Sequence, residues 1–288
     1  MASRVSTIPR RQWTHGLRHF TSSKLAGISA AILVLVVIIA LAAPLIAPYP
    51  PLQTGVSPAL IPPSTTNLFG TDDLGRDGFS AIVFGARTAL TVGGIAGFVA
   101  FAVGILLGCW GGLRGGRVDD FLMRVVEAFQ VLPVFFVMLV IASVFGPSTE
   151  VTALVLGLLA VPSVARLVRA EALALREADY VAAGYALGNT HLTVAFRHVL
   201  PGVLGTALTV SSLEVASAIL TEAGLSFLGF SDSNVASWGA MLNNSRQFLS
   251  SAWWMAVFPG AAIAVVVLSI NSVAEGLANM TNPRLVQR

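Results

Sequence analysis

Charged residues are scarce in this 288-residue sequence, where Asp, Glu, Lys and Arg together make up 11% of the chain. Soluble proteins carry about 25% charged residues, so this chain has too few to cover a globular surface. Hydrophobic residues reach 55%, and the mean hydropathy is +0.80. At about 20 residues per membrane-spanning helix, the length accommodates several spans but no second large domain. The composition predicts a single polytopic membrane domain.

Cysteine and lysine are each represented once, by Cys109 and Lys24. A single cysteine excludes a disulfide framework and a thiolate metal cluster within the chain, so Cys109 is interpreted as a packing residue. Leu25 follows Lys24, whereas a phosphate-binding P-loop needs Gly-Lys-Ser/Thr. The chain therefore does not itself bind ATP in that way. Any ATP on which it depends must be hydrolysed by another protein.

Sites for nucleic acid, metal and covalent chemistry are also missing from the sequence. The net charge of +3 and the isoelectric point near 9.6 come from scattered basic residues, whereas nucleic-acid binding needs a basic face with stacking aromatic residues. No His-Glu-x-x-His motif occurs, and no metal site is expected. The predicted spans hold no aspartate or histidine in their cores, which disfavours intramembrane proteolysis. We therefore predict a non-catalytic chain.

The gaps between charged residues locate the predicted membrane spans. A charge at mid-bilayer costs about 2.5–3.5 kcal/mol on insertion scales, so an apolar stretch of about 20 residues with few charges indicates a transmembrane helix. Such stretches predict an all-α membrane protein with six transmembrane helices. They lie at 25–47, between Arg87 and Arg114, between Glu127 and Glu150, and at 151–167, 201–225 and 253–275.

Basic residues are unevenly distributed over the predicted loops. If the N-terminus is cytoplasmic, fourteen of the seventeen Lys and Arg residues lie inside, and Arg76, Arg87 and Arg246 lie outside. Because cytoplasmic loops carry the excess of basic residues, both termini are predicted to be cytoplasmic. The expected parts are a cytoplasmic or interfacial segment at 1–24, a first transmembrane helix at 25–47, an extracytoplasmic loop at 48–85, a membrane core at 86–275 and a cytoplasmic tail at 276–288.

Two of the predicted cytoplasmic segments have helical patterns. Trp13, Leu17 and Phe20 share one helical face among basic residues, which is typical of a helix lying on the inner membrane surface. The longest inside loop, about 169–200, is rich in Ala, Leu, Glu and Arg and contains no proline. We expect short surface helices there. Pro201 suits the first turn of the next span, where its missing N–H costs nothing.

Glycine recurs at intervals of four residues at Gly104, Gly108 and Gly112. This spacing places the three residues on one face of the second predicted span. Ridges of small residues let helices approach closely in lipid, where no hydrophobic force drives them together. We interpret the three glycines as helix-packing residues in a tight bundle.

Glu214 is the acidic residue that lies well inside a predicted span, roughly 18 Å past Pro201 at the helical rise per residue. An intramembrane carboxylate is by default a candidate functional group. Two interpretations are open. Glu214 either packs between helices as a hydrogen-bonded group, or faces a translocation path and meets a cationic part of the substrate. Glu222, eight residues later, is expected near the outer interface, where it would be more easily solvated.

Residues 67–90 read NLFGTDDLGRDGFSAIVFGARTAL. This segment resembles the entry sequence of the dipeptide/oligopeptide/nickel class of bacterial ABC importer permeases. KLAG at 24–27 and APLIAPYPP at 43–51 resemble the C-type member of the permease pair rather than the B-type. Further matching stretches lie at 111–124, 166–202, 222–230, 237–242 and 253–260, and the closing NPR lies at 282–284.

The resemblance implies the type I ABC importer permease fold in the cytoplasmic (inner) membrane of a bacterium. It implies a heterodimer with a related B-type permease, two cytoplasmic ABC ATPase subunits and an extracytoplasmic solute-binding protein. ATP and Mg would be bound by the ATPases, and this chain would hold no cofactor. The substrate implied is a di- or oligopeptide or a related small solute, with nickel or a metal chelate as the alternative. An ATPase-independent secondary transporter is the alternative from a different class.

The resemblance also implies that the 169–200 loop contains the helix that docks on an ATPase. The family's coupling motif reads Glu-Ala-Ala, three residues, then Gly, followed later by Leu-Pro. Its glutamate is missing here, because Ala182, Ala183 and Gly184 occupy the triplet. Asp179 lies three residues earlier on the same helical face and is a candidate to replace it in part, while Tyr180 and Ala183 are candidates for the contact face. The motif's later positions are retained as Gly188, Leu200 and Pro201.

Overall fold

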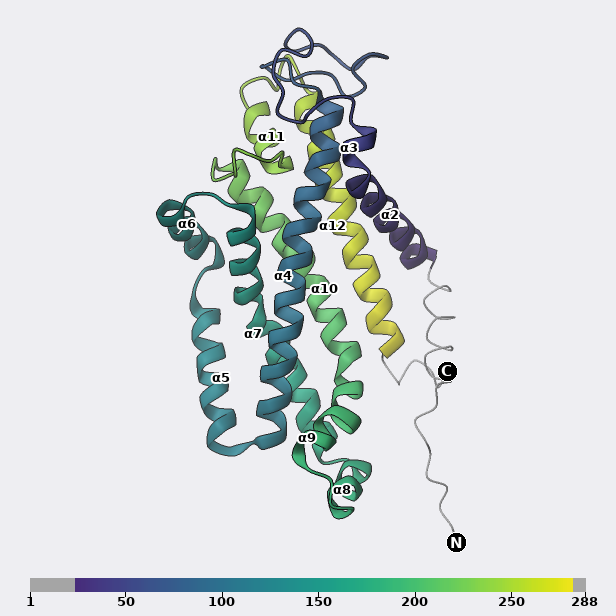
Figure 1. Ribbon diagram of the computed structural model, residues 1–288, viewed down its shortest axis with the longest axis vertical. Coiled ribbons are helices and arrows are strands. Elements are labelled where there is room, and N and C mark those ends of the chain that lie inside the picture. Colours follow the sequence, from purple (N-terminus) through teal and green to yellow (C-terminus); the bar gives the residue numbers. More distant parts are fainter. Residues whose placement is uncertain (1–23, 282–288) are drawn as a thin grey trace.

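The computed structural model describes residues 24–281, and every regular element in that range is a helix (Figure 1). The surface helix expected around Trp13, Leu17 and Phe20 and the tail from 282 onward lie outside the described residues. In chain order the elements are α2 (Lys24–Leu41), α3 (Ala43–Ile46), α4 (Gly78–Arg114), α5 (Gly116–Val131), α6 (Val134–Phe145), α7 (Thr149–Arg176), α8 (Asp179–Ala186), α9 (His191–Val194), the π-helix η1 (Ala195–Val199), α10 (Leu200–Phe227), α11 (Trp238–Ser245) and α12 (Trp254–Thr281).

Among the described residues, five helical segments are long and apolar enough to cross a membrane: α2, α4, α7, η1 with α10, and α12. A sixth span exists if the bent pair α5 and α6 is counted as one. The prediction of an all-α membrane protein is therefore confirmed. The α2, α4, α7, α10 and α12 helices run side by side along the long axis of the molecule (Figure 1).

The third span differs from the continuous helix expected between Glu127 and Glu150. The axis bends by 78° between α5 and α6, and the break lies at Leu132 and Pro133. Leu132 takes an extended conformation (φ −75°, ψ 121°), since the residue before a proline is disfavoured in the α region. Pro133 also lacks the N–H that would continue the helix. The start is also earlier than predicted, because α5 begins at Gly116.

Several predicted boundaries need correction. The 48–85 loop is shorter than expected, because α4 already begins at Gly78; the Asp77 carboxylate caps it by accepting from the Ser80 N–H at 2.8 Å. Helix α7 continues to Arg176, well into the predicted 169–200 loop. Helix α12 continues to Thr281, past the expected start of the tail, and α11 was not predicted.

Helix α4 is the central element and packs along α7. A Cβ atom at Gly104 would lie 2.6 Å from Val164 Cβ, and one at Gly108 would lie 2.6 Å from the Ala165 carbonyl oxygen. Real Cβ contacts are not this short, so the two helix backbones approach where only glycine fits. A Cβ atom at Gly112 would lie 2.8 Å from Ala172 Cβ. The structure thus places the predicted glycine ridge against α7.

The 47–77 segment covers one end of the bundle, beside α11 and the start of α12 (Figure 1). Trp254 fixes it to α12 by donating its indole N–H to the Thr71 carbonyl oxygen at 3.1 Å. Trp238 of α11 donates in the same way to the Ile82 carbonyl oxygen of α4 at 3.0 Å. We call this end the α11 end and the opposite one, which carries α8 and α9, the α8 end (Figure 1).

Candidate functional site

The α8 end contains the short helices expected in the 169–200 loop. Val181 of α8 is fully buried and packs in one hydrophobic cluster with Val194, Val199 and Val203. These three residues belong to α9, η1 and α10, so the cluster joins α8 to the start of the next span.

The residues predicted to form the coupling site lie on both faces of α8. Asp179, Tyr180, Ala182 and Ala183 are exposed. Gly184 is buried instead, and a Cβ atom there would lie 3.4 Å from Nε2 of His198. The exposed face of α8 thus presents a carboxylate, a phenol and two small residues, while Gly184 serves the contact with η1.

Gly188 ends α8 in the left-handed conformation, with φ +83°. Glycine is the usual residue at such a helix end. Asn189 completes the turn, because its side-chain amide donates to the Gly184 carbonyl oxygen at 2.9 Å. Leu200 and Pro201 then begin α10, where proline stands in the first turn as predicted from its missing N–H.

Arg169 and Asp119 join α7 to α5 near the same end. Arg169 Nε donates to Oδ1 of Asp119 and Nη2 donates to Oδ2, both at 2.5 Å. The residue Gly111 makes room, since a Cβ atom there would lie 2.8 Å from Asp119 Oδ1. This pair was not predicted, because its two residues are 50 positions apart in the chain.

Glu214 lies near the middle of α10 and is partly buried. Ser163 of α7 lies near its carboxylate. This neighbour fits the first interpretation of Glu214 as a group packed between helices, and the partial exposure of Glu214 leaves room for the second. No His, Cys, Asp and Glu cluster of three or more members that could hold a metal ion occurs within residues 24–281.

Glu222 is buried, with 8% of its surface exposed, so the expectation of a solvated side chain is wrong. Its Oε1 accepts hydrogen bonds from the hydroxyls of Ser226 at 2.7 Å and Ser237 at 2.8 Å. Ser237 also caps α11 by accepting from the Gly239 N–H at 3.2 Å. Glu222 therefore joins the part of α10 at the α11 end to the start of α11.

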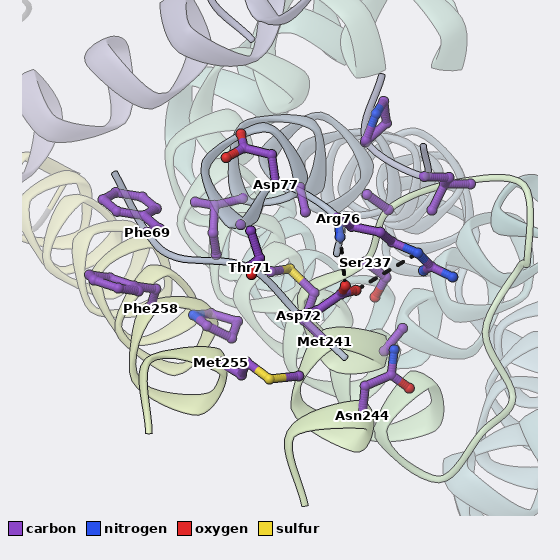
Figure 2. Close-up of a pocket in the computed structure, with 18 of the residues that line it drawn as sticks. Phe69, Thr71, Asp72, Arg76, Asp77, Ser237, Met241, Asn244, Met255 and Phe258 are labelled. Atoms are coloured by element: carbon purple, nitrogen blue, oxygen red, sulfur yellow. Dashed lines mark hydrogen bonds and ion pairs between the residues drawn. The ribbon is translucent and has the colours of Figure 1, made fainter. Parts of the chain in front are cut away.

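A pocket of about 70 Å³ lies at the α11 end, between the 47–77 segment, α11 and the start of α12. Figure 2 shows Asp72 and Arg76 facing each other within it, and the ion pair measures 3.7 Å from Arg76 Nε to Asp72 Oδ2. Phe69 and Phe258 stack at one side with their ring centres 4.2 Å apart. Sequence reasoning had not identified this pocket, although both charged residues belong to the recognised 67–90 segment.

Desolvation has the largest effect on the pKa of Asp72 in this pocket. Burial raises the pKa of Asp72 above its ordinary value of 3.8. The backbone N–H groups of Arg76 and Leu74 and the Arg76 charge act in the opposite direction but do not cancel it. The Asp72 side chain accepts those two N–H bonds at 2.8 and 2.9 Å. The Asp72 carboxylate is thus fixed by two backbone hydrogen bonds in a poorly hydrated pocket.

Comparison with known protein families identifies the family of this chain. Residues 104–287 match the family described as binding-protein-dependent transport system inner membrane component. The chain belongs to that family. Residues 11–63 of the permease also match the N-terminal transmembrane domain of oligopeptide transport permease C. The resemblance found in the sequence segments is thereby confirmed.

Individual relatives cover nearly the whole permease. It is 34% identical over 274 residues to the dipeptide transport system permease protein DppC of Alkalihalophilus pseudofirmus, covering 95% of this chain and 90% of the relative. It is 33% identical over 263 residues to the probable D,D-dipeptide transport system permease protein DdpC of Escherichia coli, covering 91% and 88%. It is 32% identical over 285 residues to the oligopeptide transport system permease protein OppC of Bacillus subtilis, covering 99% and 93%.

The family supplies the inner-membrane component of ABC importers, so the permease is a multi-pass inner-membrane transport subunit. This assignment agrees with the spans found among its described residues.

Proposed function

We propose that this permease moves di- or oligopeptides across the inner membrane as the C-type half of a permease pair. The observation that carries the proposal is the match along nearly the entire chain to relatives named for dipeptide and oligopeptide transport. The N-terminal match to permease C supports the C-type assignment within the pair. A related B-type permease would complete the heterodimer.

In this proposal two ABC ATPases bind at the α8 end, which is the cytoplasmic end. The excess of basic residues on that side supports the orientation, and with it two cytoplasmic termini. The exposed face of α8, with Asp179, Tyr180 and Ala183, is the docking surface. ATP and Mg are bound by the ATPases, because this chain lacks the Gly-Lys-Ser/Thr of a P-loop.

Transport then follows from a two-state change that the partners bias. ATP binding draws the ATPases together and moves α8. Val181 carries that motion into the cluster with Val199 and Val203 at the start of α10. The permease pair opens outward, a solute-binding protein releases its substrate at the α11 end, and hydrolysis resets the pair.

Purification of the tagged chain in mild detergent from its native cell, followed by mass spectrometry of what remains bound, tests the assembly. We expect a second, related permease and ATPase subunits. The complex is then reconstituted in proteoliposomes with its binding protein and supplied with labelled peptides or with nickel. Peptide uptake that requires ATP supports the proposal. Uptake of nickel alone, or transport by this chain without ATPases, contradicts it.

A further inference from the structure

The pocket between the 47–77 segment, α11 and the start of α12 contains a hydrogen-bond donor that lacks an acceptor. Nε of Arg76 is buried, and no other atom of residues 24–281 forms a hydrogen bond with it. The Asp72 carboxylate faces it in Figure 2, but the 3.7 Å from Nε to Oδ2 is too long for a hydrogen bond. Buried donors are nearly always paired, so this one indicates a partner that the chain itself does not supply.

Asp72 places an unused acceptor beside that donor. Its Oδ1 accepts the backbone N–H groups of Leu74 at 2.9 Å and Arg76 at 2.8 Å. Because these two bonds fix the orientation of the carboxylate, Oδ2 does not rotate toward Nε of Arg76. Over the described part of the chain, Oδ2 itself accepts no hydrogen bond. The pocket thus presents one donor and one acceptor side by side, 3.7 Å apart.

The turn that carries this pair is braced by further hydrogen bonds. The Asp72 carbonyl oxygen accepts from the N–H groups of Leu60 at 3.0 Å and Gly75 at 3.1 Å. The preceding carbonyl oxygen, of Thr71, accepts the indole N–H of Trp254 at 3.1 Å. The open pair is therefore preorganised, and binding a group between its two members needs little further ordering of the loop.

The charges around the pocket favour a neutral occupant over an ion. The charged residues that line it are Asp72, Arg76 and Asp77. Asp77 already has partners, since its Oδ2 accepts the N–H and the hydroxyl of Ser80 at 2.8 and 2.7 Å. An anion would satisfy Arg76 but meet Oδ2 of Asp72, whereas a cation would satisfy Asp72 but leave Arg76 Nε without an acceptor. A carboxamide is neutral and carries both an acceptor and a donor, so it can pair with both residues.

The size of the pocket matches a carboxamide side chain. Its volume of about 70 Å³ has room for about five water molecules at roughly 10–15 Å³ each, which is close to the size of a glutamine side chain. A whole dipeptide is too large for this space. Met241, Met255 and Phe258 provide apolar walls for the aliphatic stem of such a side chain (Figure 2).

We infer that the pocket binds the carboxamide of an asparagine or glutamine side chain on the extracytoplasmic solute-binding protein. The inference rests on the proposed function, which places that partner at the α11 end. Asn244 of α11 lines the pocket, is exposed, and lies on the same side as Arg76 in Figure 2, so the pocket is open to a partner there. The amide oxygen accepts from Arg76 Nε, the amide N–H donates to Asp72 Oδ2, and water leaves the pocket.

Small probes test the pocket without a partner protein and without transport. Propionamide carries the amide on a short stem, while propionate and propylammonium carry a charge of either sign on a stem of similar length. Binding of each probe to the assembled importer in detergent is measured by saturation-transfer NMR. We expect propionamide to bind about tenfold or more tightly than either ion, the value of one hydrogen bond to a charged group. Propionamide that fails to bind, or that binds no better than an ion, would overturn the carboxamide site.

Two variants show whether the probe binds in this pocket. Arg76→Met removes the donor and keeps the aliphatic stem, and Ala240→Leu fills the pocket from α11 without changing the ion pair. Each should weaken propionamide binding about tenfold or more. Ala240→Leu decides the result if Arg76→Met lowers the melting temperature of the importer. Arg246→Met is the matched control, because Arg246 follows α11 at the same end but lies outside the pocket lining. Full propionamide binding by both pocket variants would contradict this site.

The affinity of the solute-binding protein for the same importers in lipid nanodiscs tests the occupant. Its Kd should rise about tenfold for Arg76→Met and Ala240→Leu and stay unchanged for Arg246→Met. Saturating propionamide should likewise raise the Kd for the unmodified importer and have no effect on Ala240→Leu. An unchanged Kd in both pocket variants, or an equal rise for Arg246→Met, would rule out this partner as the occupant. If the unmodified importer moves no peptide, the proposed function fails, and the propionamide results still stand or fall by themselves.

Discussion

Arg169 of α7 holds Asp119 of α5 in a two-pronged hydrogen bond, with both N–O distances at 2.5 Å. Asp119 is almost fully buried, whereas about a third of the Arg169 side chain is exposed. The chain reverses direction just before this pair, at Gly115 and Gly116, which have φ values of +62° and +61°. This ion pair holds the start of α5 against α7, and the packing of Met123 and Val126 against Val161 and Ala165 continues the contact.

Asp119→Ala should destabilise the permease by about 1–3 kcal/mol, because Arg169 loses two charge-assisted hydrogen bonds and solvent relieves only part of the loss. Thermal unfolding of the purified importer in detergent measures the effect. Arg169→Lys should lower the free energy of unfolding by less, since lysine keeps the charge but lacks the two parallel donors of the guanidinium group. The double variant Asp119→Ala with Arg169→Ala completes a mutant cycle. A coupling energy near zero would show that the pair does not hold α5.

Gly108→Ala should also destabilise the permease, by about 1–3 kcal/mol, because the added methyl group would meet the Ala165 carbonyl oxygen at 2.6 Å and force α4 and α7 apart. Gly94→Ala is a matched control on the same helix, since nothing lies within 4 Å of a Cβ atom there. That variant should retain full stability. Equal melting temperatures for the two variants would contradict the close packing of the glycine ridge against α7.

The sequence predicts those features of the fold that depend only on residues close together in the chain. Long apolar stretches with few charges predicted α2, α7, α10 and α12, because a span needs only its own residues to be recognisable. Helix α5 escaped the same reasoning, because Arg124 and Glu127 were interpreted as marks of a loop. They stand instead on one flank of an amphipathic helix, which a search for charge-free stretches does not detect.

Contacts between distant residues explain the other differences. Buried Glu222 accepts a hydrogen bond from Ser237, which lies fifteen residues further along the chain. The spacing of the two residues in the sequence does not predict this bond. The Asp119 partnership with Arg169 is equally invisible in sequence. The exposed and buried faces of α8 were only partly predictable, since Gly184 is buried by a contact with His198 of η1.

Asp72→Asn should flatten the pH dependence of stability just above pH 3.8. Because burial raises the pKa of Asp72 above 3.8 in the folded chain, protonated Asp72 stabilises the fold below that pH, and the contribution is lost as the pH rises through the raised pKa. Asparagine cannot ionise, yet its side-chain oxygen still accepts the backbone bonds of Leu74 and Arg76. The melting temperature of the purified importer is measured as a function of pH.

Glu177→Gln, which changes an exposed carboxyl group, is the control for the Asp72 experiment. It should leave the slope of the melting temperature against pH unchanged. An Asp72→Asn variant with the full slope of the unmodified permease would show that Asp72 does not titrate in this window.

Ala183→Arg should uncouple transport while leaving membrane insertion intact. Ala183 stands on the exposed face of α8, and the added guanidinium would prevent close docking of an ATPase subunit. We expect substrate-stimulated ATP hydrolysis by the reconstituted importer to fall about tenfold or more, equivalent to about 1.4 kcal/mol of lost docking energy. Ala174→Arg, at an exposed alanine of α7 outside the named docking face, is the control and should retain full coupling. Normal peptide uptake by the Ala183→Arg importer would count against docking at α8.

Glu214→Gln distinguishes the two interpretations of the carboxylate in α10. Glutamine keeps the shape of the side chain and can still form a hydrogen bond with Ser163, so a purely structural role predicts normal uptake and an unchanged melting temperature. If Glu214 meets the cationic end of the solute, the importer should need a higher concentration of peptide to reach half-maximal uptake, by about tenfold for one lost ionic contact. Glu214→Asp, which keeps the charge, should recover part of the affinity. Uptake by Glu214→Gln that is unchanged in both affinity and rate would remove Glu214 from the solute path and leave it as a link between α7 and α10.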